Sequence, residues 1–344
     1  MKLLVTGGAG FIGSNYVRYV LDEHSDVDVV NLDALTYAGN LENLAGLEDV
    51  PRYTFVKGDI TSVDDVSAVF EQHEFDAVVN FAAESHVDRS LHVGVAEFIR
   101  TNIQGVQNLL ERSMEKGVGR FLQISTDEVY GSLGEAGKFT ETSPIQPNNP
   151  YAASKAAADF FVRAAHKSHG LDIAITRCSN NFGPYQFPEK LIPLVVANAL
   201  EDKDLPVYGD GMQVRDWIYV LDHCSAIDTV LRKAGPGSIY NVGGDQEVPN
   251  IEMVKMILGI LGKPETLIKH VQDRPGHDRR YAMDAGKLRS ELGWEPAHSF
   301  ADALKETVDW YLANGEWLAR VRSGEYQKYY EEMYGGREEV SSGR

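Results

Sequence analysis

Near the start of the chain, the apolar run Leu3-Leu4-Val5-Thr6 leads directly into Gly7-Gly8-Ala9-Gly10-Phe11-Ile12-Gly13. This order predicts a strand, a tight turn and a helix. Gly7 allows the turn, Gly10 lets a pyrophosphate approach the backbone, and Gly13 lets the helix pack closely on the strand. Free N–H groups and the positive dipole end of the helix would then face the phosphates. The spacing is GxxGxxG rather than the commoner GxGxxG. The prediction of a phosphate site therefore depends on the strand before the glycines and the helix after them.

An acidic residue at the expected distance supports a dinucleotide site. Asp33 ends the next apolar run, 20 residues after Gly13. A carboxylate there accepts hydrogen bonds from an adenosine ribose and repels a 2′-phosphate, which favours NAD over NADP. Asp59 follows the third apolar run, where it could contact the adenine or cap the next helix.

Short apolar runs alternate with amphipathic stretches through the first half of the chain. The predicted strands are Lys2–Thr6, Val27–Leu32, Tyr53–Lys57, Ala77–Phe81, Phe121–Ser125 and Ile173–Arg177, and the predicted helices are Phe11–Glu23, Ser62–Gln72, Glu97–Lys116 and Ala152–His169. Such alternation is typical of βαβ units in a parallel sheet with helices on both faces. The predicted fold class is α/β, with a Rossmann-like doubly wound sheet.

The pattern changes near residue 180, where prolines become frequent. We expect residues 1–180 to form the NAD-binding domain, residues 181–330 a smaller mixed α/β lobe for substrate, and residues 335–344 a frayed tail. Asp216–Val220 and Ser238–Val242 are candidates to return strands to the main sheet. The helices expected beyond residue 180 are Leu191–Glu201, Asp222–Lys233, Asn250–Leu261, Ala285–Leu292 and Ala301–Leu312.

Composition excludes several classes of protein. The 344 residues carry a formal net charge of −18, which argues against nucleic acid or anionic membranes as partners. Two cysteines cannot form a disulfide framework, and no apolar run approaches the ~20 residues that span a bilayer. We therefore expect a cytoplasmic protein. The histidines and carboxylates show no metal-ligand spacing, so no metal is expected.

Two segments carry residues suited to acid–base chemistry. Tyr151 and Lys155 lie one helical turn apart, and a lysine ammonium would favour the tyrosine phenolate. Thr126, Asp127 and Glu128 follow the fifth predicted strand, at the sheet edge where ligands bind. Adjacent carboxyl groups can divide acid and base work if their pKa values separate. The alternatives are a surface pair at 151–155 and helix-capping carboxylates at 127–128.

Several further motifs together resemble the extended short-chain dehydrogenase/reductase superfamily and, within it, the dTDP-glucose 4,6-dehydratase family. They are Thr6–Gly13, Asp33–Asn40, Phe81–Ser90, Ser125–Gly131, Tyr151–Lys155, Arg177–Asn181, Gly183–Gln186, Pro188–Pro193, Tyr208–Gly211, Arg215–Trp217 and Arg274–Asp278. The resemblance spans about residues 2–312. The Asp-Glu pair at 127–128 is its most specific element, since a sugar-nucleotide epimerase has no need of it.

The resemblance implies an NAD-dependent lyase of deoxysugar biosynthesis. Tyr151 would take a proton from the glucose 4-hydroxyl, with Thr126 on that oxygen, while hydride passes from C4 to NAD. Glu128 would then remove the C5 proton, Asp127 would protonate the leaving 6-hydroxyl, and hydride would return to C6. The product would be dTDP-4-dehydro-6-deoxy-glucose. Whether the pathway beyond it leads to rhamnose or to an antibiotic sugar stays open.

The resemblance also implies the binding residues. Those expected to contact NAD are Gly7, Gly10, Phe11, Ile12, Gly13, Asp33, Thr36, Asp59, Ile60, Ala82, Ser125, Tyr151, Lys155 and Asn180. Those expected to contact the nucleotide sugar are Ser85, Thr126, Asn180, Glu189, Lys190, Leu191, Pro206, Tyr208, Arg215, Asn250, Arg274 and His277. Arginine is the expected local partner of the diphosphate, because its fork pairs with phosphate oxygens.

Three alternatives remain on sequence grounds. The chain could be a sugar-nucleotide 4-epimerase, a 4,6-dehydratase of another nucleotide sugar, or a non-enzymatic NAD-binding sensor on the same fold. The resemblance further implies a homodimer built through a four-helix bundle, with Glu97–Lys116 and Ala152–His169 as the paired helices. An apolar stripe on a helix can equally well face the core of a single chain, so the pattern alone does not distinguish a dimer interface from a core.

Overall fold

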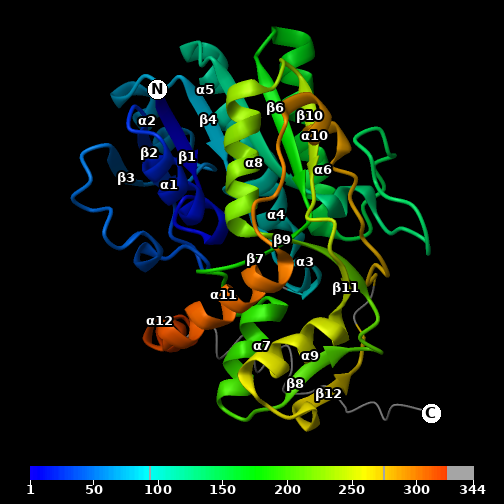
Figure 1. Ribbon diagram of the computed structural model, residues 1–344. Coiled ribbons are helices and arrows are strands. Elements are labelled where there is room, and N and C mark those ends of the chain that lie inside the picture. The colour runs from blue at the N-terminus through cyan, green and yellow to red at the C-terminus, as the bar shows by residue number, and fades with distance from the viewer. Residues whose placement is uncertain (93, 274–275, 324–344) are drawn as a thin grey trace.

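The computed structural model describes residues 1–92, 94–273 and 276–323 of the chain. Its main feature is a seven-stranded sheet in the order β3-β2-β1-β4-β5-β6-β10, with every neighbouring pair parallel (Figure 1). The strands are β1 (Lys2–Thr6), β2 (Asp28–Asp33), β3 (Tyr53–Lys57), β4 (Ala77–Asn80), β5 (Arg120–Thr126), β6 (Ile173–Cys178) and β10 (Ser238–Val242). This doubly wound order confirms the predicted fold class.

Helices cover both faces of this sheet. On one face α1 packs against α8, as Figure 1 shows in front of the strands, and on the other α5 packs between α2 and α6. Their bounds are α1 (Phe11–Glu23), α2 (Val63–Gln72), α5 (Val106–Lys116), α6 (Pro150–His169) and α8 (Val220–Lys233). Polar side chains cap the N-termini of α2 and α6. Ser62 accepts from the Asp65 N–H, and Asn149 accepts from the Ala152 N–H.

The single helix predicted over 97–116 is wrong in detail. The segment contains α4 (Val95–Ile99), a π-helical stretch η2 (Arg100–Gly105) and then α5. Asn102 lies buried within these wider turns, where its Oδ1 accepts from the Glu84 N–H at 2.9 Å and its Nδ2 donates to Ser154 Oγ at 2.8 Å. Single π turns are often found at functional sites.

The smaller lobe lies below the main sheet in Figure 1. It holds a two-stranded parallel pair, β8 (Leu205–Tyr208) with β12 (Ile268–Val271), and the helices α7 (Leu191–Leu200) and α9 (Asn250–Leu261). The remaining elements are η1 (Leu41–Leu44), α3 (Val87–His92), η3 (Asp127–Tyr130), β7 (Asn180–Phe182), β9 (Val214–Tyr219), β11 (Glu247–Pro249), η4 (Glu265–Leu267), α10 (Gly286–Leu292), α11 (Phe300–Ala313) and α12 (Gly315–Val321).

One of the two expected returning strands joins the main sheet. Residues 238–242 form β10 on the free edge of β6, as expected. Residues 216–220 do not, because β9 pairs with β7 and β11 in a separate three-stranded sheet. Strand β10 occupies the edge of β6, and the Ser179 N–H just after β6 still donates to the Val242 carbonyl of β10. The chain then forms β7, which pairs with β9. The frayed tail expected at 335–344 lies outside the described residues.

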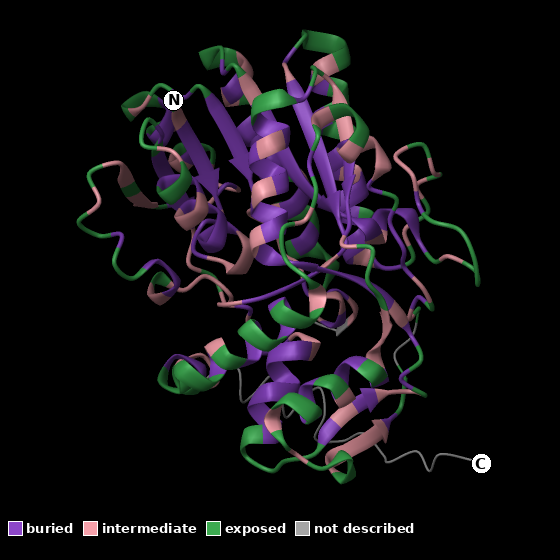
Figure 2. Ribbon diagram, in the orientation of Figure 1, coloured by how far each residue is buried: buried purple, intermediate pink, exposed green. Residues whose placement is uncertain are grey.

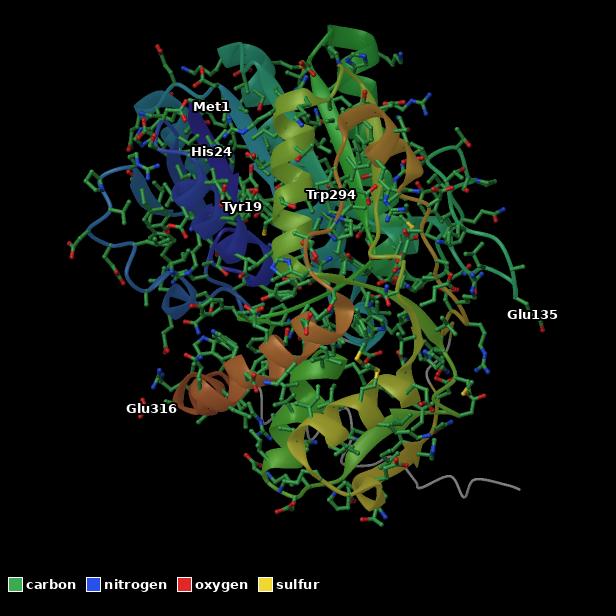
Figure 3. All side chains as sticks on the ribbon, in the orientation of Figure 1. Met1, Tyr19, His24, Glu135, Trp294 and Glu316 are labelled. Atoms are coloured by element: carbon green, nitrogen blue, oxygen red, sulfur yellow. The ribbon has the colours of Figure 1, made fainter. Side chains whose placement is uncertain are left out.

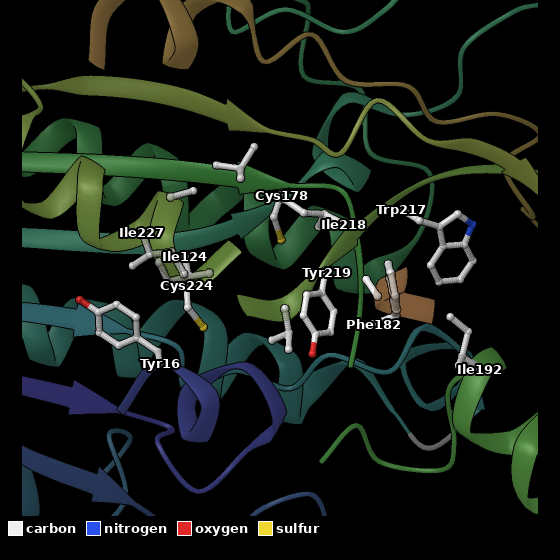
Figure 4. Close-up of a cluster of buried hydrophobic side chains, with 14 of the residues drawn as sticks. Tyr16, Ile124, Cys178, Phe182, Ile192, Trp217, Ile218, Tyr219, Cys224 and Ile227 are labelled. Atoms are coloured by element: carbon white, nitrogen blue, oxygen red, sulfur yellow. The ribbon is translucent and has the colours of Figure 1, made fainter. Parts of the chain in front are cut away.

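Apolar burial joins the sheet to the smaller lobe. The inner strands β1, β2, β4, β5 and β6 of the main sheet are almost wholly buried (Figure 2), and one hydrophobic cluster runs from Leu3 through Phe182 and Trp217 to Ile192. Figure 4 shows part of this cluster, where the free cysteines Cys178 and Cys224 both lie. No helix in the described part of the chain combines the length and the apolar character needed to cross a bilayer.

The last helices return to the first domain. The Trp317 Nε1–H of α12 donates to Asn43 Oδ1 at 3.0 Å, and Asn43 Nδ2 donates to the carbonyl of Ala9 at 2.9 Å. Glu316 marks α12 in Figure 3. Trp294, labelled elsewhere in the same figure, is held separately, since its indole N–H donates to Ser225 of α8. The glycine turn is therefore connected, through one asparagine, to a helix near the end of the described chain.

Candidate active site

The glycine turn has the shape that a pyrophosphate needs. Gly7 has φ of +72°, and a Cβ at Gly13 would lie 2.3 Å from the carbonyl oxygen of Gly7. Helix α1 begins at Phe11 with Gly10 before it, and no side chain caps its first N–H groups. These donors face the cleft and fit an anion.

Asp33 supports the turn from the end of β2. Its Oδ2 accepts from the Ala9 N–H and its Oδ1 from the Leu35 N–H, both at 2.8 Å. Burial raises the pKa of this carboxyl, and the two N–H groups act in the opposite direction. Each oxygen keeps a second lone pair, so the carboxylate can also accept from a ribose hydroxyl.

A cleft of about 390 Å³ crosses the carboxyl ends of the parallel strands. All the residues expected to act in catalysis or to contact the cofactor line it, namely Gly7, Gly10, Phe11, Ile12, Gly13, Asp33, Thr36, Asp59, Ile60, Ala82, Ser125, Thr126, Asp127, Glu128, Tyr151, Lys155 and Asn180. Of the other expected substrate residues, Ser85, Glu189 and Lys190 also line it. An elongated ligand with an anionic middle, such as NAD, fits this lining.

The two carboxyl groups after β5 differ in their surroundings. Asp127 is buried, its Oδ1 accepts from the Thr126 hydroxyl at 3.2 Å, and its Oδ2 has no hydrogen-bond partner among the described residues. Burial, Glu128 and Asp216 hold the pKa of Asp127 well above its usual range. Glu128 Oε2 accepts from Asn149 Nδ2 at 3.0 Å. This pair can therefore divide into a proton donor and a proton acceptor.

Tyr151 and Lys155 enter the cleft from the first turns of α6. Burial raises the pKa of the Tyr151 phenol well above 10, the negative charge of Glu128 raises it further, and a hydrogen bond with Thr126 lowers it. Lys155 Nζ donates to the carbonyl of Ile124 at 2.7 Å. Burial and the charge of Glu128 thus oppose the phenolate of Tyr151, which the Lys155 ammonium was expected to favour. A positive charge bound in the cleft would favour the phenolate.

Glu189 and Lys190 sit where the two lobes meet. The pKa of Glu189 is raised to about 7, mainly by burial, with Lys190 and Arg89 acting against the rise. The Tyr37 hydroxyl donates to Glu189 at 3.3 Å, and Lys190 Nζ donates to the carbonyl of Ser85 at 3.1 Å. Both side chains are therefore held at the wall of the cleft.

The remaining expected substrate residues lie beyond the lining of this cleft. They are Leu191, Pro206, Tyr208, Arg215, Asn250 and His277, all on the smaller lobe or its sheet, while Arg274 lies outside the described residues. The Tyr208 hydroxyl reaches Asp88 at 3.2 Å, which joins the lobes. Arg215 is buried, with its guanidinium 4.4 Å from the Tyr281 ring centre.

Three further residues of the cleft lining were not predicted from the sequence. Thr101, Arg100 and Glu84 line the cleft, and the first two come from the π-helical stretch. The motif Phe81–Ser90 contains Glu84 and could have indicated it. Thr101 lies in no such motif and lines the cleft from the π-helical stretch. No group of three or more potential metal ligands is found among residues 1–92, 94–273 and 276–323.

Known proteins are similar to this chain in both fold and sequence. A family model described as GDP-mannose 4,6 dehydratase matches residues 4–307. A dTDP-glucose 4,6-dehydratase of Xanthomonas campestris pv. campestris (strain B100) is 56% identical over 342 residues, covering 94% of this chain and 97% of the relative. The chain belongs to the dTDP-glucose 4,6-dehydratase family.

Solved structures agree with this membership. The dTDP-glucose 4,6-dehydratase of Streptomyces venezuelae, with NAD and TYD bound, has a TM-score of 0.90 and 51% identity, covering 93% of this chain and 100% of that one. A UDP-glucose 4-epimerase of Thermus thermophilus, in complex with NAD, has a TM-score of 0.84 at 30% identity, covering 91% and 100%. The fold is thus shared with epimerases, while the higher identity lies with the dehydratases.

Proposed function

We propose that this chain is an NAD-dependent lyase that converts dTDP-glucose to dTDP-4-dehydro-6-deoxy-glucose with loss of water. The observation that carries the proposal is the pair Asp127 and Glu128, one buried with its pKa held well above the usual range, the other bound to Asn149. An epimerase needs only oxidation and reduction at C4. Elimination of water across C5 and C6 needs both a proton donor and a proton acceptor.

The residues act in the following order in this proposal. Tyr151 Oη takes the proton of the 4-hydroxyl, while Thr126 Oγ1 hydrogen-bonds the same oxygen and Lys155 favours the phenolate. When bound, NAD supplies the hydride acceptor for C4 and the hydride donor for C6. The 4-ketone acidifies the C5 proton, which a carboxylate oxygen of Glu128 removes. Asp127 donates its proton to the 6-hydroxyl, which leaves as water, and a proton then adds at C5.

The binding residues divide between the two lobes in the same proposal. Residues 1–180 hold NAD, with the glycine turn on its pyrophosphate, and residues 181–330 supply most contacts to the nucleotide sugar. Glu189, Lys190 and Asn180 would bind near the sugar and diphosphate. Tyr208, Arg215 and Asn250 would bind toward the nucleoside.

We also propose a cytoplasmic homodimer formed through a four-helix bundle, to which each copy contributes α6 and the helical segment of α4, η2 and α5. The supporting observation is a group of large apolar side chains left exposed on these helices, between 42% and 53% accessible: Val95, Ile99, Phe160 and Phe161. Burying such side chains against a second copy removes apolar surface from water. Sedimentation of the wild-type chain and of Phe160→Lys tests this, since the variant should be monomeric.

Mass spectrometry of the sugar nucleotide tests the reaction itself. Incubation with dTDP-glucose should give a product lighter by one water, without net NADH, and in D₂O the product should carry one deuterium at C5. UDP-glucose serves as the competing substrate. An unchanged mass with a new isomer would indicate an epimerase, and no change in any sugar nucleotide would favour a binding protein.

A variant of the proposed base, Glu128, separates NAD binding from loss of the C5 proton. Glu128→Gln should keep NAD bound and should slow loss of the C5 proton by roughly 10²- to 10⁴-fold, the usual contribution of a positioned general base. Glu135→Gln is the matched control, because Glu135 lies exposed on an outer loop (Figure 3). Wild-type turnover by the Glu128 variant would exclude this assignment.

A further inference from the structure

One buried side chain joins the two segments that carry the proposed catalytic groups. Asp127 and Glu128 lie on η3, whereas Tyr151 and Lys155 lie on α6, which packs against η3. Asn149 is the residue directly before α6, and it is 8% exposed. It does not line the cleft, and the proposed reaction gives it no step. Its contacts nevertheless reach both segments.

The two ends of the Asn149 amide have different partners. Its Oδ1 accepts from the Ala152 N–H at 2.8 Å, and its Nδ2 donates to Glu128 Oε2 at 3.0 Å. A backbone N–H cannot accept a hydrogen bond and an ionised carboxylate cannot donate one, so these partners admit only this orientation of the amide. The amide therefore holds the first turn of α6 and the carboxylate of Glu128 at the same time.

The carboxylate of Glu128 depends on this single contact. Asn149 is the only side chain that hydrogen-bonds it among residues 1–92, 94–273 and 276–323. The Glu128 N–H donates to Thr126 Oγ1 at 3.3 Å, which fixes the main chain but not the torsions of the side chain. A hydrogen bond to an ionised group is stronger than one between neutral groups, so the amide determines where the carboxylate points.

The proposed reaction requires its two bases to be placed relative to each other. Tyr151 acts on the 4-hydroxyl and Glu128 on the C5 proton, at adjacent carbon atoms of one sugar ring. A misplacement of about 1 Å is enough to slow a chemical step roughly 100-fold. Asn149 ties the Glu128 carboxylate to the start of the helix that carries Tyr151, and this contact meets the requirement.

We propose that Asn149 is a positioning residue, which fixes the carboxylate of Glu128 relative to Tyr151 for removal of the C5 proton. The inference rests on the proposed function, in which Glu128 is the base at C5. The competing explanation is a purely structural role, in which Asn149 only caps α6.

Two variants separate these roles. Asn149→Asp keeps the size of the side chain and an oxygen for the Ala152 N–H, and aspartate caps helices as well as asparagine does. It lacks the donor and turns a second carboxylate toward Glu128. Asn149→Ala lacks both the donor and the cap. A capping role predicts wild-type turnover for Asn149→Asp, whereas a positioning role predicts slow loss of water in both variants.

The measurement is a single turnover of dTDP-glucose by the NAD-loaded chain. The absorbance of NADH reports oxidation at C4, and mass spectrometry of quenched samples reports loss of water. In Asn149→Asp, NADH should form at close to the wild-type rate and water loss should slow roughly ten- to 100-fold, the usual effect of losing a hydrogen bond to a charged group. NADH should therefore accumulate. Ser299→Asp is the matched control, because it places a carboxylate at the exposed cap of α11, outside the cleft lining.

Two results would overturn the proposal. One is product formation by Asn149→Asp at the wild-type rate, and the other is equal slowing of oxidation and water loss in that variant. If Asn149→Asp fails to fold, Asn149→Ala decides the question. NADH should accumulate in this variant too, whereas equal slowing of both steps would indicate damage to α6 and contradict the positioning role.

A double variant asks whether Asn149 acts through Glu128. In Glu128→Gln the carboxylate is already gone, so adding Asn149→Asp should slow loss of the C5 proton no further. Entry of deuterium at C5 in D₂O measures this step. A further slowing as large as that caused by Asn149→Asp alone would overturn the proposal.

Failure of the proposed function has a different signature. A wild-type chain that removes no water from dTDP-glucose would overturn the proposed function and this inference together. A wild-type chain that dehydrates the sugar, while Asn149→Asp does so equally fast, would overturn this inference alone.

Discussion

Replacing Gly13 by alanine should weaken NAD binding without unfolding the chain. The new Cβ would lie 2.3 Å from the Gly7 carbonyl oxygen and 2.8 Å from the Gly8 Cα, whereas ordinary contact begins near 3.4 Å. Helix α1 must therefore retreat from the turn by about 1 Å, and overpacking of this kind costs about 1–3 kcal/mol. Because the retreat carries the first N–H groups of α1 away from the pyrophosphate, the Kd for NAD should rise roughly five- to 150-fold.

The assay is calorimetric titration of the cofactor-stripped protein with NAD, together with thermal unfolding. Gly259→Ala is the matched control, since a Cβ at Gly259 in α9 meets nothing within 4 Å. That variant should gain about 0.5–1 kcal/mol of stability and bind NAD as the wild type does. A folded Gly13→Ala variant that binds NAD within about twofold of the wild type would refute the steric reasoning.

Three further changes test other parts of the structure. The pKa of buried Asp216 is raised from its ordinary value of 3.8 to about 6, so this group favours the folded state fully below 3.8, and the gain is lost as the pH rises from there through 6. Asp216→Asn should therefore be more stable than the wild type at pH 7.5, by up to about 3 kcal/mol, and lose most of that advantage at pH 4.5 in guanidinium unfolding. Trp317→Phe removes the donor to Asn43, and scanning calorimetry should show a loss of about 1–3 kcal/mol; an unchanged Tm would contradict this. Ser62→Ala removes the cap of α2 at the Asp65 N–H and should cost about 1 kcal/mol in urea unfolding, against a neutral result if the cap contributes nothing.

The regular part of the fold could be predicted because its signals are local. The glycine turn, the alternation of apolar runs and amphipathic stretches, and Asp33 at the end of β2 lie within short windows of sequence. Predicted and observed bounds of β1, β3, α1 and α9 coincide. The position of the cleft could be predicted as well, since ligands bind where the carboxyl ends of parallel strands meet.

What could not be predicted depends on contacts between distant residues. Within the π-helical stretch Asn102 bonds Ser154, 52 residues away, and Thr101 of the same stretch lines the cleft. Asn149 gives no sign in the sequence that it both begins α6 and binds Glu128. Likewise the pairing of β9 with β7 and β11, while β10 takes the edge of β6, joins segments that no local pattern connects.

The bridge from Trp317 through Asn43 to Ala9 has a consequence for the order in which the protein matures. Asn43 and Trp317, which make one of its two hydrogen bonds, are 274 residues apart, so a ribosome has made nearly all of the described chain before the bridge can form. Until then the loop beside the glycine turn lacks one of its fixed partners. Nascent chains and fragments that end before α12 should therefore retain NAD less well than the finished protein, and cofactor capture becomes a late event in biosynthesis.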